Sequence, residues 1–396
     1  MRDEYDVIVV GAGPGGSTAA RVAAEECNVL LIEKRQEIGS PVRCAEGVPR
    51  PPFSMLLERA PDPKWVACEI NAIRINAPDG TAVDVSPEMI HTEEPLGYVL
   101  ERKIFDRQLA KEAARAGAHV MVRTRATGLI TEDGVVKGVR MNRLGEDFEV
   151  RSKVVIGADG VESQVGRWAG LNTTLKLRDI ESCAQYHMDN VDVRDETLDF
   201  YLGSRYSPSG YAWIFPKGDR AANVGLGVLG SKITDKRPID YLNVFVADKF
   251  PDGQPVELVM GGVPVSEGLR ALTSDGVMLV GDAARHTEPL SGGGIIPALD
   301  SGITAGRIAR KAVQQKDAST KVLREYETEF NNNPYGKQRK RMYKAKEFVV
   351  HRSDEEFNRV INVMHGVTPE EMTMKGIIAR LLKKDPKLLF MIRHLL

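Results

Sequence analysis

The sequence predicts a mixed α/β (α+β) fold, in which a parallel sheet with covering helices is interrupted by antiparallel β structure and followed by a helical region. Three short apolar runs indicate the parallel sheet, because branched residues without alternation are typical of strands buried on both faces. They occupy residues 7–10, 154–156 and 277–280. Residues 181–229 have the pattern of strands without a helical period, and the pattern from residue 331 onward is helical.

Length and composition limit the class of protein. A chain of 396 residues can bury a large core and is expected to form two or three domains. The formal net charge of −1 predicts no general attraction to nucleic acid. We expect no signal peptide, since the first strand begins near Tyr5, and no apolar run is long enough to span a bilayer. The few cysteines lack the spacing of metal ligands, so a reduced, cytoplasmic compartment and no metal site are expected.

Residues 5–33 predict a dinucleotide-binding β-α-β unit. Gly11, Gly13 and Gly16 fit the pattern G-x-G-x-x-G, in which the glycines allow a tight turn, a close approach of pyrophosphate to the backbone, and close packing of helix on strand. The next strand ends in Glu33, which is placed to accept hydrogen bonds from ribose hydroxyls and to disfavour a 2′-phosphate. A Gly-rich turn in an unrelated β-α-β unit is the alternative. The predicted cofactor-binding residues here are Gly11, Ala12, Gly13, Gly15, Gly16 and Glu33.

The rest of the chain alternates between this domain and β structure. Gly and Pro mark residues 34–48 as a loop, which follows the ribose-binding strand and is expected to run along the cofactor. Further predicted elements are an antiparallel pair at 66–76 and 81–85, a helix ending at Gly117, strands at 118–123, 135–141 and 147–150, and helices at 235–250 and 295–314. The predicted domains are a discontinuous cofactor domain (1–65, 98–175 and 270–330), an antiparallel-sheet substrate domain (66–97 and 176–269) and a helical region (331–396).

The C-terminal region combines apolar helix faces with positive charge. Residues 331–396 carry 14 Lys and Arg against 7 Asp and Glu, which suggests an anionic ligand or surface nearby. A capping box at 368–371 predicts the start of one helix, and the Asp-Pro pair at 385–386 predicts the start of another. The six basic residues at 337–346 have two interpretations, a solvated helix face or a contact with an anion.

Three further motifs accompany the glycine pattern. An R-x-x-F-D segment begins at Arg102, a Gly-Ala-Asp-Gly turn contains Asp159, and an apolar strand ends in Gly281-Asp282. With these motifs, residues 1–330 resemble the FAD-dependent flavoproteins of the p-hydroxybenzoate hydroxylase type. The resemblance implies a Rossmann-like FAD-binding domain. It also implies that Asp282 bonds the ribityl chain, that Asp159 lies near the pyrophosphate, and that Arg102 contacts the FAD.

The glycines at 292–294 precede a predicted helix, and they allow backbone N–H groups to approach a flavin ring closely. The positive end of that helix would stabilise an anionic reduced flavin. The alternative is that these glycines only cap the helix. The residues predicted to contact the cofactor here are Gly293, Gly294 and Ile295.

Two more segments point to the substrate. Residues 208–216 follow the pattern P-x-x-Y-x-W-x-F-P, and residues 41–47 form a loop that contains Cys44. Both are similar to motifs of the geranylgeranyl reductase family, in particular of its archaeal members that saturate the isoprenoid chains of membrane glycerophospholipids. The predicted substrate-binding residues are Pro208, Tyr211, Trp213, Phe215 and Pro216, and the loop adds Arg43, Cys44, Ala45 and Gly47 to the predicted cofactor-binding residues.

The spacing of the aromatic residues suits a substrate site. On a strand, Tyr211, Trp213 and Phe215 share one face and form an aromatic wall that would hold a flat alkene against the flavin. An ordinary aromatic sheet core is the alternative. Reduction of an unactivated alkene needs hydrogen from the reduced flavin and a proton, for which Cys44 and Tyr211 are the predicted catalytic candidates. The residues alone do not choose between them, and no role is predicted for His286.

The predicted function is FAD-dependent saturation of the C=C bonds of geranylgeranyl chains in archaeal membrane lipids. A FAD-dependent aromatic monooxygenase of the same fold and a non-catalytic flavin-containing lipid carrier are the alternatives. No second G-x-G-x-x-G offers a nicotinamide site, so the electron donor is left as NAD(P)H or a protein such as reduced ferredoxin. The expected partners are a polyprenyl lipid, that donor and a membrane surface, where the protein would be peripheral; no nucleic acid is expected.

Overall fold

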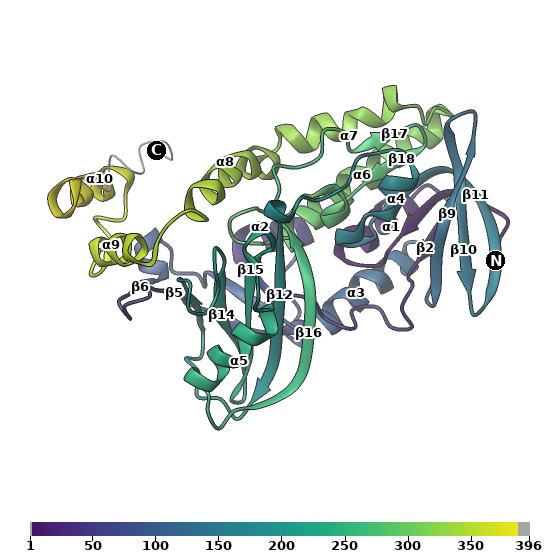
Figure 1. Cartoon of the computed structure of the whole chain (residues 1–396). Coiled ribbons are helices and arrows are strands. Elements are labelled where there is room, and N and C mark those ends of the chain that lie inside the picture. Colours follow the sequence, from purple (N-terminus) through teal and green to yellow (C-terminus); the bar gives the residue numbers. More distant parts are fainter. Residues whose placement is uncertain (1, 387–396) are drawn as a thin grey trace. The chain divides into compact units, whose positions relative to one another are not determined.

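The computed structural model describes residues 2–386, with Met374 described by its backbone alone. Figure 1 shows its helices and strands, whose contacts divide the chain into two compact units. Unit 1 contains residues 1–42, 102–176 and 263–343, and unit 2 contains residues 43–101, 177–262 and 344–396. The domains predicted from the sequence are functional divisions with other bounds, and they stay a prediction.

Unit 1 is built on an eight-stranded sheet that contains the order β18-β11-β1-β2-β8. The strand β1 (Glu4–Val10) lies between β2 (Val29–Ile32) and β11 (Glu146–Gly157) and is parallel to both. Residues 7–10 are buried, as the uninterrupted apolar run predicts for a strand inside a parallel sheet. The remaining strands of this sheet are β8 (His119–Met121), β9 (Thr124–Glu132), β10 (Val135–Arg143), β17 (Thr273–Ser274) and β18 (Val277–Leu279).

Small residues allow the helices of unit 1 to pack closely. The helix α1 (Pro14–Ala24) leads from β1 toward β2 and packs on α3 (Arg102–Arg115) and α6 (Ile295–Gln315). A Cβ at Gly302 of α6 would overlap the carbonyl oxygen of Gly15, so only glycine permits this approach. The other helices of this unit are α4 (Gln164–Trp168), α7 (Thr320–Asn332) and the first part of α8 (Pro334–Val349).

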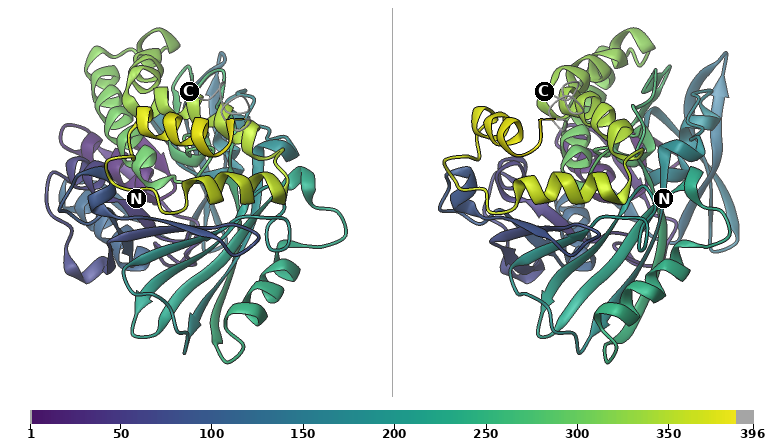
Figure 2. Two further views of the ribbon diagram at one scale, coloured as in Figure 1. Left: turned by 90° about the vertical axis from the view of Figure 1, so that its left-hand side faces the viewer. Right: turned by 60° about the vertical axis from the view of Figure 1, so that its left-hand side comes forward.

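Unit 2 is built on a seven-stranded sheet with the order β16-β12-β15-β14-β13-β5-β6 and on a three-stranded sheet with the order β3-β7-β4. One face of the larger sheet packs against α5 (Pro238–Lys249), which runs beside the long strands in Figure 2. The strands are β3 (Gly47–Pro49), β4 (Val66–Ile70), β5 (Ala72–Asn76), β6 (Ala82–Val85), β7 (Gly97–Leu100), β12 (Ile180–Asp189), β13 (Thr197–Tyr201), β14 (Tyr211–Gly218), β15 (Ala221–Leu229) and β16 (Gln254–Pro264). The other helices are α2 (Arg50–Leu57), α9 (Asp354–Met364) and α10 (Met374–Lys384).

Two predicted strands have different bounds in the structure. The strand predicted at 66–76 is broken at Asn71, so its first half joins the three-stranded sheet as β4 and only β5 pairs with β6. The run predicted at 147–150 continues into the apolar run at 154–156 as the single strand β11, because buried and exposed residues keep alternating between them.

The capping box predicted near the C-terminus does not start a helix. The N–H of Glu371 donates to the carbonyl of Thr368, which makes a single turn, and the Glu371 carboxylate pairs with Arg380 of α10. The hydroxyl of Thr373 caps α10 instead, by accepting a backbone hydrogen bond from its first turn. The second helix, predicted to start at 385–386, falls mainly on residues beyond those described.

Candidate functional site

The glycine loop where β1 leads into α1 has no room for a side chain at two of its glycines, whereas the third glycine has open space beside it. A Cβ at Gly11, where φ is +104°, would overlap the carbonyl oxygen of Ala158, and a Cβ at Gly16 would overlap the carbonyl oxygen of Gly11. Around the Cβ position of Gly13, by contrast, no described heavy atom lies within 4 Å. The loop therefore has the tight turn and the close helix–strand packing that the pattern predicts, and it leaves the middle glycine open to a ligand.

Glu33 reaches this loop from the end of β2. Its Oε2 accepts a hydrogen bond of 3.1 Å from the backbone N–H of Ala12, and its Oε1 accepts one of 3.0 Å from the N–H of Arg35. The carboxylate is thus fixed beside the loop. Its oxygens have further lone pairs for hydroxyl donors, because each carboxylate oxygen can accept two hydrogen bonds.

Asp159 follows β11 and lies against the same loop. Its Oδ2 accepts a hydrogen bond of 2.9 Å from the N–H of Val165, whereas its Oδ1 is buried without a hydrogen-bond partner among the described residues. Burial raises the pKa of this carboxyl. A buried acceptor without a donor costs about 1–3 kcal/mol. A bound dinucleotide with hydroxyl donors would satisfy this oxygen, so the site fits such a cofactor.

Asp282 lies at the start of the short 3₁₀ helix η6 (Gly281–Ala284), close to the beginning of α6. Its Oδ1 accepts a hydrogen bond of 2.9 Å from the hydroxyl of Thr287 and lies 3.2 Å from the Cβ position of Gly294. Gly294 is the N-cap of α6, which has no side-chain cap among the described residues. The first N–H groups of α6, from Ile295 onward, are therefore available to an anionic or electron-rich ligand beside Asp282.

Ala298 of α6 contacts both the glycine loop and the residues beside Asp282. We call these two parts together the cradle. The Cβ of Ala298 lies 3.5 Å from the Cβ position of Gly15 in the glycine loop and 3.3 Å from that of Gly281. Gly293 precedes the helix, where its N–H donates to the hydroxyl of Ser291 at 3.3 Å.

Arg102 also belongs to this cradle. Its guanidinium donates two hydrogen bonds of 2.7 Å to the carboxylate of Asp106, one turn further along α3, which fixes its orientation. Burial raises the pKa of Asp282, and the hydrogen bond from Thr287 and the charges of Arg285 and Arg102 oppose that rise. The residues that the resemblance assigns to FAD in unit 1 are therefore brought into one region, while their contacts with FAD stay a prediction.

In unit 2, the loop that carries Cys44 is held on the large sheet. The Sγ of Cys44 accepts a hydrogen bond of 3.2 Å from the N–H of Glu46. The backbone carbonyl of Cys44 accepts a hydrogen bond of 3.1 Å from Nε2 of Gln185 on β12. Asn223 on β15 donates to the carbonyl of Ala45 at 3.3 Å. None of the four cysteines, all within the described residues, forms a disulfide.

A buried polar network lies beneath this loop. The ammonium of Lys217 lies 2.8 Å from Oε2 of Glu46 and 2.8 Å from Oε1 of Glu101, and donates to the carbonyl of Leu100 at 2.6 Å. Asn223 donates to the same Glu46 oxygen at 2.7 Å. The side chains of Lys217 and Glu46 are only 4% and 6% exposed. Sequence reasoning missed this network, because Lys217, which directly follows the aromatic motif, is far from Glu46 in the sequence.

Tyr211, Trp213 and Phe215 share one face of β14, as predicted. The face belongs to a cluster that also contains Phe200, whose ring lies 5.3 Å from Tyr211 and 5.4 Å from Phe215, between centroids. The indole N–H of Trp213 donates to Oε1 of Gln185 at 3.0 Å. Gln185 thus joins this aromatic wall to the carbonyl of Cys44.

Gly47 and Ala45 of the Cys44 loop also contact the aromatic wall. The Cβ position of Gly47 lies 2.7 Å from the ring of Phe215, and Ala45 packs on the same cluster. The side chain of Arg43 lies along β16, with its Cδ 3.4 Å from the Cβ position of Gly261. Pro208 is half-buried before β14, and Pro216 is buried opposite Ala222. Of the predicted residues of unit 2, Ala45 and Gly47 therefore lie together with the aromatic wall, and the roles of all of them stay a prediction.

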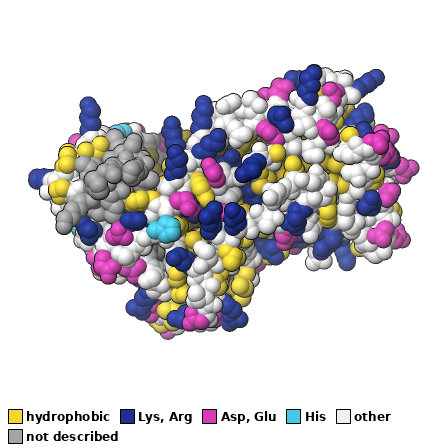
Figure 3. All heavy atoms as spheres, turned by 45° about the horizontal axis from the view of Figure 1, so that its top comes forward, with side chains coloured by type: hydrophobic (Ala, Val, Ile, Leu, Met, Phe, Trp, Pro, Cys, Tyr) yellow, Lys and Arg dark blue, Asp and Glu magenta, His cyan; other side chains and the backbone are white. Residues whose placement is uncertain are grey.

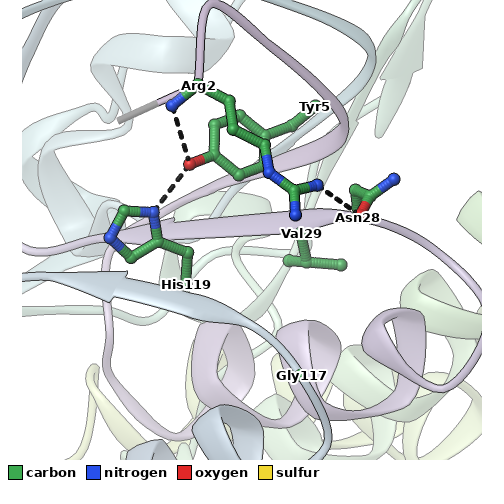
Figure 4. A pocket seen from close by; sticks show the side chains of 6 residues that line it. All are labelled: Arg2, Tyr5, Asn28, Val29, Gly117 and His119. Atoms are coloured by element: carbon green, nitrogen blue, oxygen red, sulfur yellow. Dashed lines mark hydrogen bonds between the residues drawn. The ribbon is translucent and has the colours of Figure 1, made fainter.

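A separate hollow of about 330 Å³ lies at the amino end of β1 (Figure 4). Arg2, Tyr5 and His119 line it, and the hydroxyl of Tyr5 lies 2.6 Å from Nδ1 of His119. It contains none of the predicted site residues. Ligands of parallel α/β sheets bind at the carboxyl ends of the strands, where the glycine loop lies, so this hollow is not the cofactor site.

Comparisons with known proteins agree with this geometry. A family described as "FAD dependent oxidoreductase" matches residues 6–213, and one described as "Geranylgeranyl reductase catalytic domain" matches residues 179–263. The chain is 53% identical to a digeranylgeranylglycerophospholipid reductase of Methanocella arvoryzae, with 98% of each chain covered. It is 48% identical to the protein of the same name from Methanothrix thermoacetophila, with 98% of this chain and 99% of the relative covered.

Solved structures show the same fold. A geranylgeranyl bacteriochlorophyll reductase-like protein from Thermoplasma acidophilum is 39% identical, with a TM-score of 0.91 and 100% of both chains covered. A flavin-dependent brominase, 18% identical with a TM-score of 0.68 over 98% of this chain and 99% of the brominase, shares the fold alone. The cofactor is FAD, which the cradle of unit 1 fits. The chain belongs to the digeranylgeranylglycerophospholipid reductase family of FAD-dependent oxidoreductases.

Proposed function

We propose that this protein saturates the C=C bonds of geranylgeranyl chains in a membrane glycerophospholipid. The observation that carries the proposal is the aromatic wall of β14, to which the loop of Cys44 is tied through Gln185. The names of the two relatives described above support the same substrate. An isoprenoid chain offers only methyl groups, methylenes and flat alkenes, and an aromatic surface suits all three.

The residues of unit 1 would hold the FAD. Gly13 gives the pyrophosphate access to the backbone, Glu33 and Asp159 accept from hydroxyls, and Asp282 with the first N–H groups of α6 lies where an electron-rich ring system is stabilised. When bound and reduced, FAD supplies the hydride for the double bond.

The residues of unit 2 would bind the lipid chain and supply the proton. Each methylene taken out of water contributes about 0.8 kcal/mol, so a long chain binds tightly only if much of it is covered. Tyr211, Trp213 and Phe215 provide part of that cover and exclude water from the alkene. The thiol of Cys44 and the hydroxyl of Tyr211 are the two groups proposed to give the proton. The hydrogen bond from the N–H of Glu46 fixes the position of the Cys44 sulfur.

The C-terminal helices are proposed to bind the lipid headgroup or to lie on the membrane surface. In α10, Leu382 is 53% exposed, and Lys383 and Lys384 occupy the same last turn. No helix within residues 2–386 has the length and apolar character to cross a bilayer. Figure 3 shows Lys and Arg interspersed with Asp and Glu on the face in view, so a membrane contact on that face would depend on local sites.

The basic run at 337–346 contains both exposed and buried residues. Lys337, Lys340, Arg341 and Lys344 are exposed, whereas Arg339 and Lys346 are buried. Arg339 donates to the carbonyl of Arg285 at 3.2 Å, and Lys346 to the carbonyl of Arg178 at 2.9 Å. The two buried members stabilise the protein, and only the four exposed ones remain for an anion.

The proposed function is tested with FAD-loaded protein that is chemically reduced without oxygen and mixed with a geranylgeranyl glycerophospholipid. We expect the spectrum of oxidised flavin to return and the lipid to gain two hydrogens for each double bond reduced, as read by mass spectrometry. The same lipid with saturated chains is the control and should leave the flavin reduced. NAD(P)H and reduced ferredoxin, the two proposed electron donors, can then be compared as replacements for the chemical reductant.

Two outcomes would contradict the proposal. Lipid that binds without reoxidising the flavin would indicate a lipid carrier. Oxygen consumption coupled to hydroxylation of a small aromatic compound would indicate a monooxygenase.

For the membrane surface, Lys383→Glu with Lys384→Glu should weaken association with anionic vesicles at low salt, whereas Lys232→Glu, an exposed control, should not. Equal vesicle binding by both variants would remove α10 from the membrane contact.

A further inference from the structure

A carboxyl group and a thiol lie together at the Tyr211 end of the aromatic wall. Cys183 on β12, Gly227 on β15 and Tyr211 on β14 lie side by side across the sheet. Because Gly227 has no side chain, the space above it is bordered by its neighbours. The Sγ of Cys183 lies 3.2 Å from the Cβ position of Gly227, and Oε2 of Glu181 lies 3.4 Å from it. Cys183 and Tyr211 pack on the same cluster as the wall.

Glu181 has an oxygen that the fold does not satisfy. Its Oε2 is buried and has no hydrogen-bond partner among the described residues. Burial raises the pKa of this carboxyl to about 8, and the charge of Lys346 opposes the rise. At neutral pH the group is therefore largely protonated, and it can both give and take a proton.

The groups that face Glu181 come from every neighbouring element. Lys346 lies on α8, and its ammonium donates to the carbonyl of Arg178 and pairs with Glu347. From its own strand comes Cys183, and from the loop comes Cys44. Burial raises the pKa of the Cys183 thiol most, and the charges of Glu181 and Cys44 raise it further. Arg43 of the same loop lies over Gly261 on β16, and Tyr211 lies beyond Gly227.

We propose that Glu181 is the proton store of this site, a positioning residue that returns a proton to Cys44 or Tyr211 after either has given its own to the substrate. The inference rests on the proposed function. Saturating one double bond adds one hydride, supplied as stated above, and one proton. The thiol or hydroxyl that gives the proton is left as an anion, the carboxyl of Glu181 reprotonates it and becomes a carboxylate, and solvent restores the carboxyl before the next cycle.

A purely structural carboxyl and a proton store differ in how their variants respond to pH. In FAD-loaded wild-type protein, infrared spectroscopy should show the carbonyl band of a buried carboxylic acid, which titrates at about pH 8. The band should be missing in Glu181→Gln and unchanged in Glu69→Gln, a control at an exposed position in the same unit. A Glu181→Gln protein that keeps the band would overturn the assignment.

The second readout is the pH profile of lipid-dependent flavin reoxidation in a single turnover. The wild-type rate should fall as pH rises through about 8, whereas Glu181→Gln should be slower by on the order of 100-fold and lack that step. Glu181→Asp should recover part of the rate. Should Glu181→Gln fold poorly, Lys346→Met tests the same point, because loss of the opposing charge should move the step to more alkaline pH.

The outcomes separate this inference from the proposed function. If wild-type protein does not reduce the lipid, the proposed function fails, and the proton store fails with it. If wild-type protein reduces the lipid and Glu181→Gln has the same rate and the same pH profile, the proposed function stands and the proton store is wrong. A step that stays in place in Lys346→Met would likewise overturn it.

Discussion

The two regions of this protein that carry predicted site residues differ in the chemical groups that form them. The cradle of unit 1 is formed mainly by backbone groups and glycines, and most of its contacts join residues close in the chain or at the ends of adjacent strands. The site of unit 2 is formed by side chains that are distant in sequence. Gln185 holds the carbonyl of Cys44, 141 positions away, and Asn223 holds Glu46, 177 positions away.

This difference predicts which kind of substitution should damage each site. A cradle of backbone groups depends on the absence of side chains, so adding a single carbon is enough to damage it. A site of paired side chains depends on every partner being present, so removing one leaves another buried without compensation. Each of the following substitutions either adds atoms at a glycine or removes a charged or titratable group.

The largest effect is expected from Gly16→Val. Its Cβ would overlap the carbonyl oxygen of Gly11, and both atoms belong to the turn between β1 and α1. We expect little folded protein and no bound FAD, as measured by soluble yield and flavin absorbance. Gly13→Val is the matched variant, because no described atom lies within 4 Å of that Cβ position. It should fold and bind FAD about 10-fold or more weakly, about 1.4 kcal/mol. Normal FAD affinity in Gly13→Val would contradict the assignment of the loop.

The next effect is expected from Lys217→Met in unit 2. It leaves the buried carboxylate of Glu46 without its cation, and breaking such a pair costs about 3–5 kcal/mol. The free energy of unfolding in urea should fall by about that amount. Adding Glu46→Gln should recover part of the loss, because no charge is then left buried. Lys232→Met, at an exposed position, should change stability by about 0.5 kcal/mol or less. Equal effects of the two lysine variants would show that the network is not needed.

A smaller effect is expected from Gly47→Ala. The new methyl group would lie 2.7 Å from the ring of Phe215, so the loop or the ring must move, at a cost of about 1–3 kcal/mol. Stability and lipid reduction should both fall, and FAD content should fall with them only if Gly47 also contacts the cofactor, as its loop predicts. The double variant Gly47→Ala with Phe215→Leu removes the overlap and should recover stability. Unchanged stability together with unchanged lipid reduction in Gly47→Ala would contradict the contact between Gly47 and Phe215.

The smallest effect within a single pH unit is expected from the pH dependence of stability. The pKa of Glu181 is raised from the ordinary 4.5 to about 8, so the folded protein holds this proton more tightly than the unfolded chain does. The resulting stability is full below the ordinary pKa and is lost as pH rises through about 8. Urea unfolding at several pH values should therefore show wild type losing stability relative to Glu181→Gln, by at most about 1.4 kcal/mol for each pH unit. Parallel curves would show that the carboxyl is not held protonated.

Elements that are determined by neighbouring residues in the chain could be predicted from the sequence. The β1-α1-β2 unit with its three glycines, the strand β18 before Gly281-Asp282 and the helix α6 all follow from short contiguous patterns. The shared face of Tyr211, Trp213 and Phe215 follows from strand periodicity. The capping box at 368–371 failed because its Glu371 pairs with Arg380 instead of continuing a helix.

The parts that sequence reasoning missed depend on long-range pairing. Nothing near Glu46 indicates that Lys217 and Asn223 will surround it, because the register of β14 and β15 decides which side chains meet the loop. Glu181 is an ordinary glutamate in the sequence and becomes unusual only through burial beside Gly227. Such residues are found from the fold, and their local patterns carry no signal.

The most direct measurement compares FAD-loaded wild-type protein with Tyr211→Ala, both reduced without oxygen and mixed with a geranylgeranyl glycerophospholipid. If unit 1 holds the flavin and the wall of unit 2 binds the lipid, both proteins should carry the same amount of FAD. Wild type should be reoxidised with matching saturation of the lipid, and Tyr211→Ala should be reoxidised much more slowly. Wild-type flavin that stays reduced in the presence of this lipid, or a Tyr211→Ala protein that reacts as fast as wild type, would contradict this division of roles.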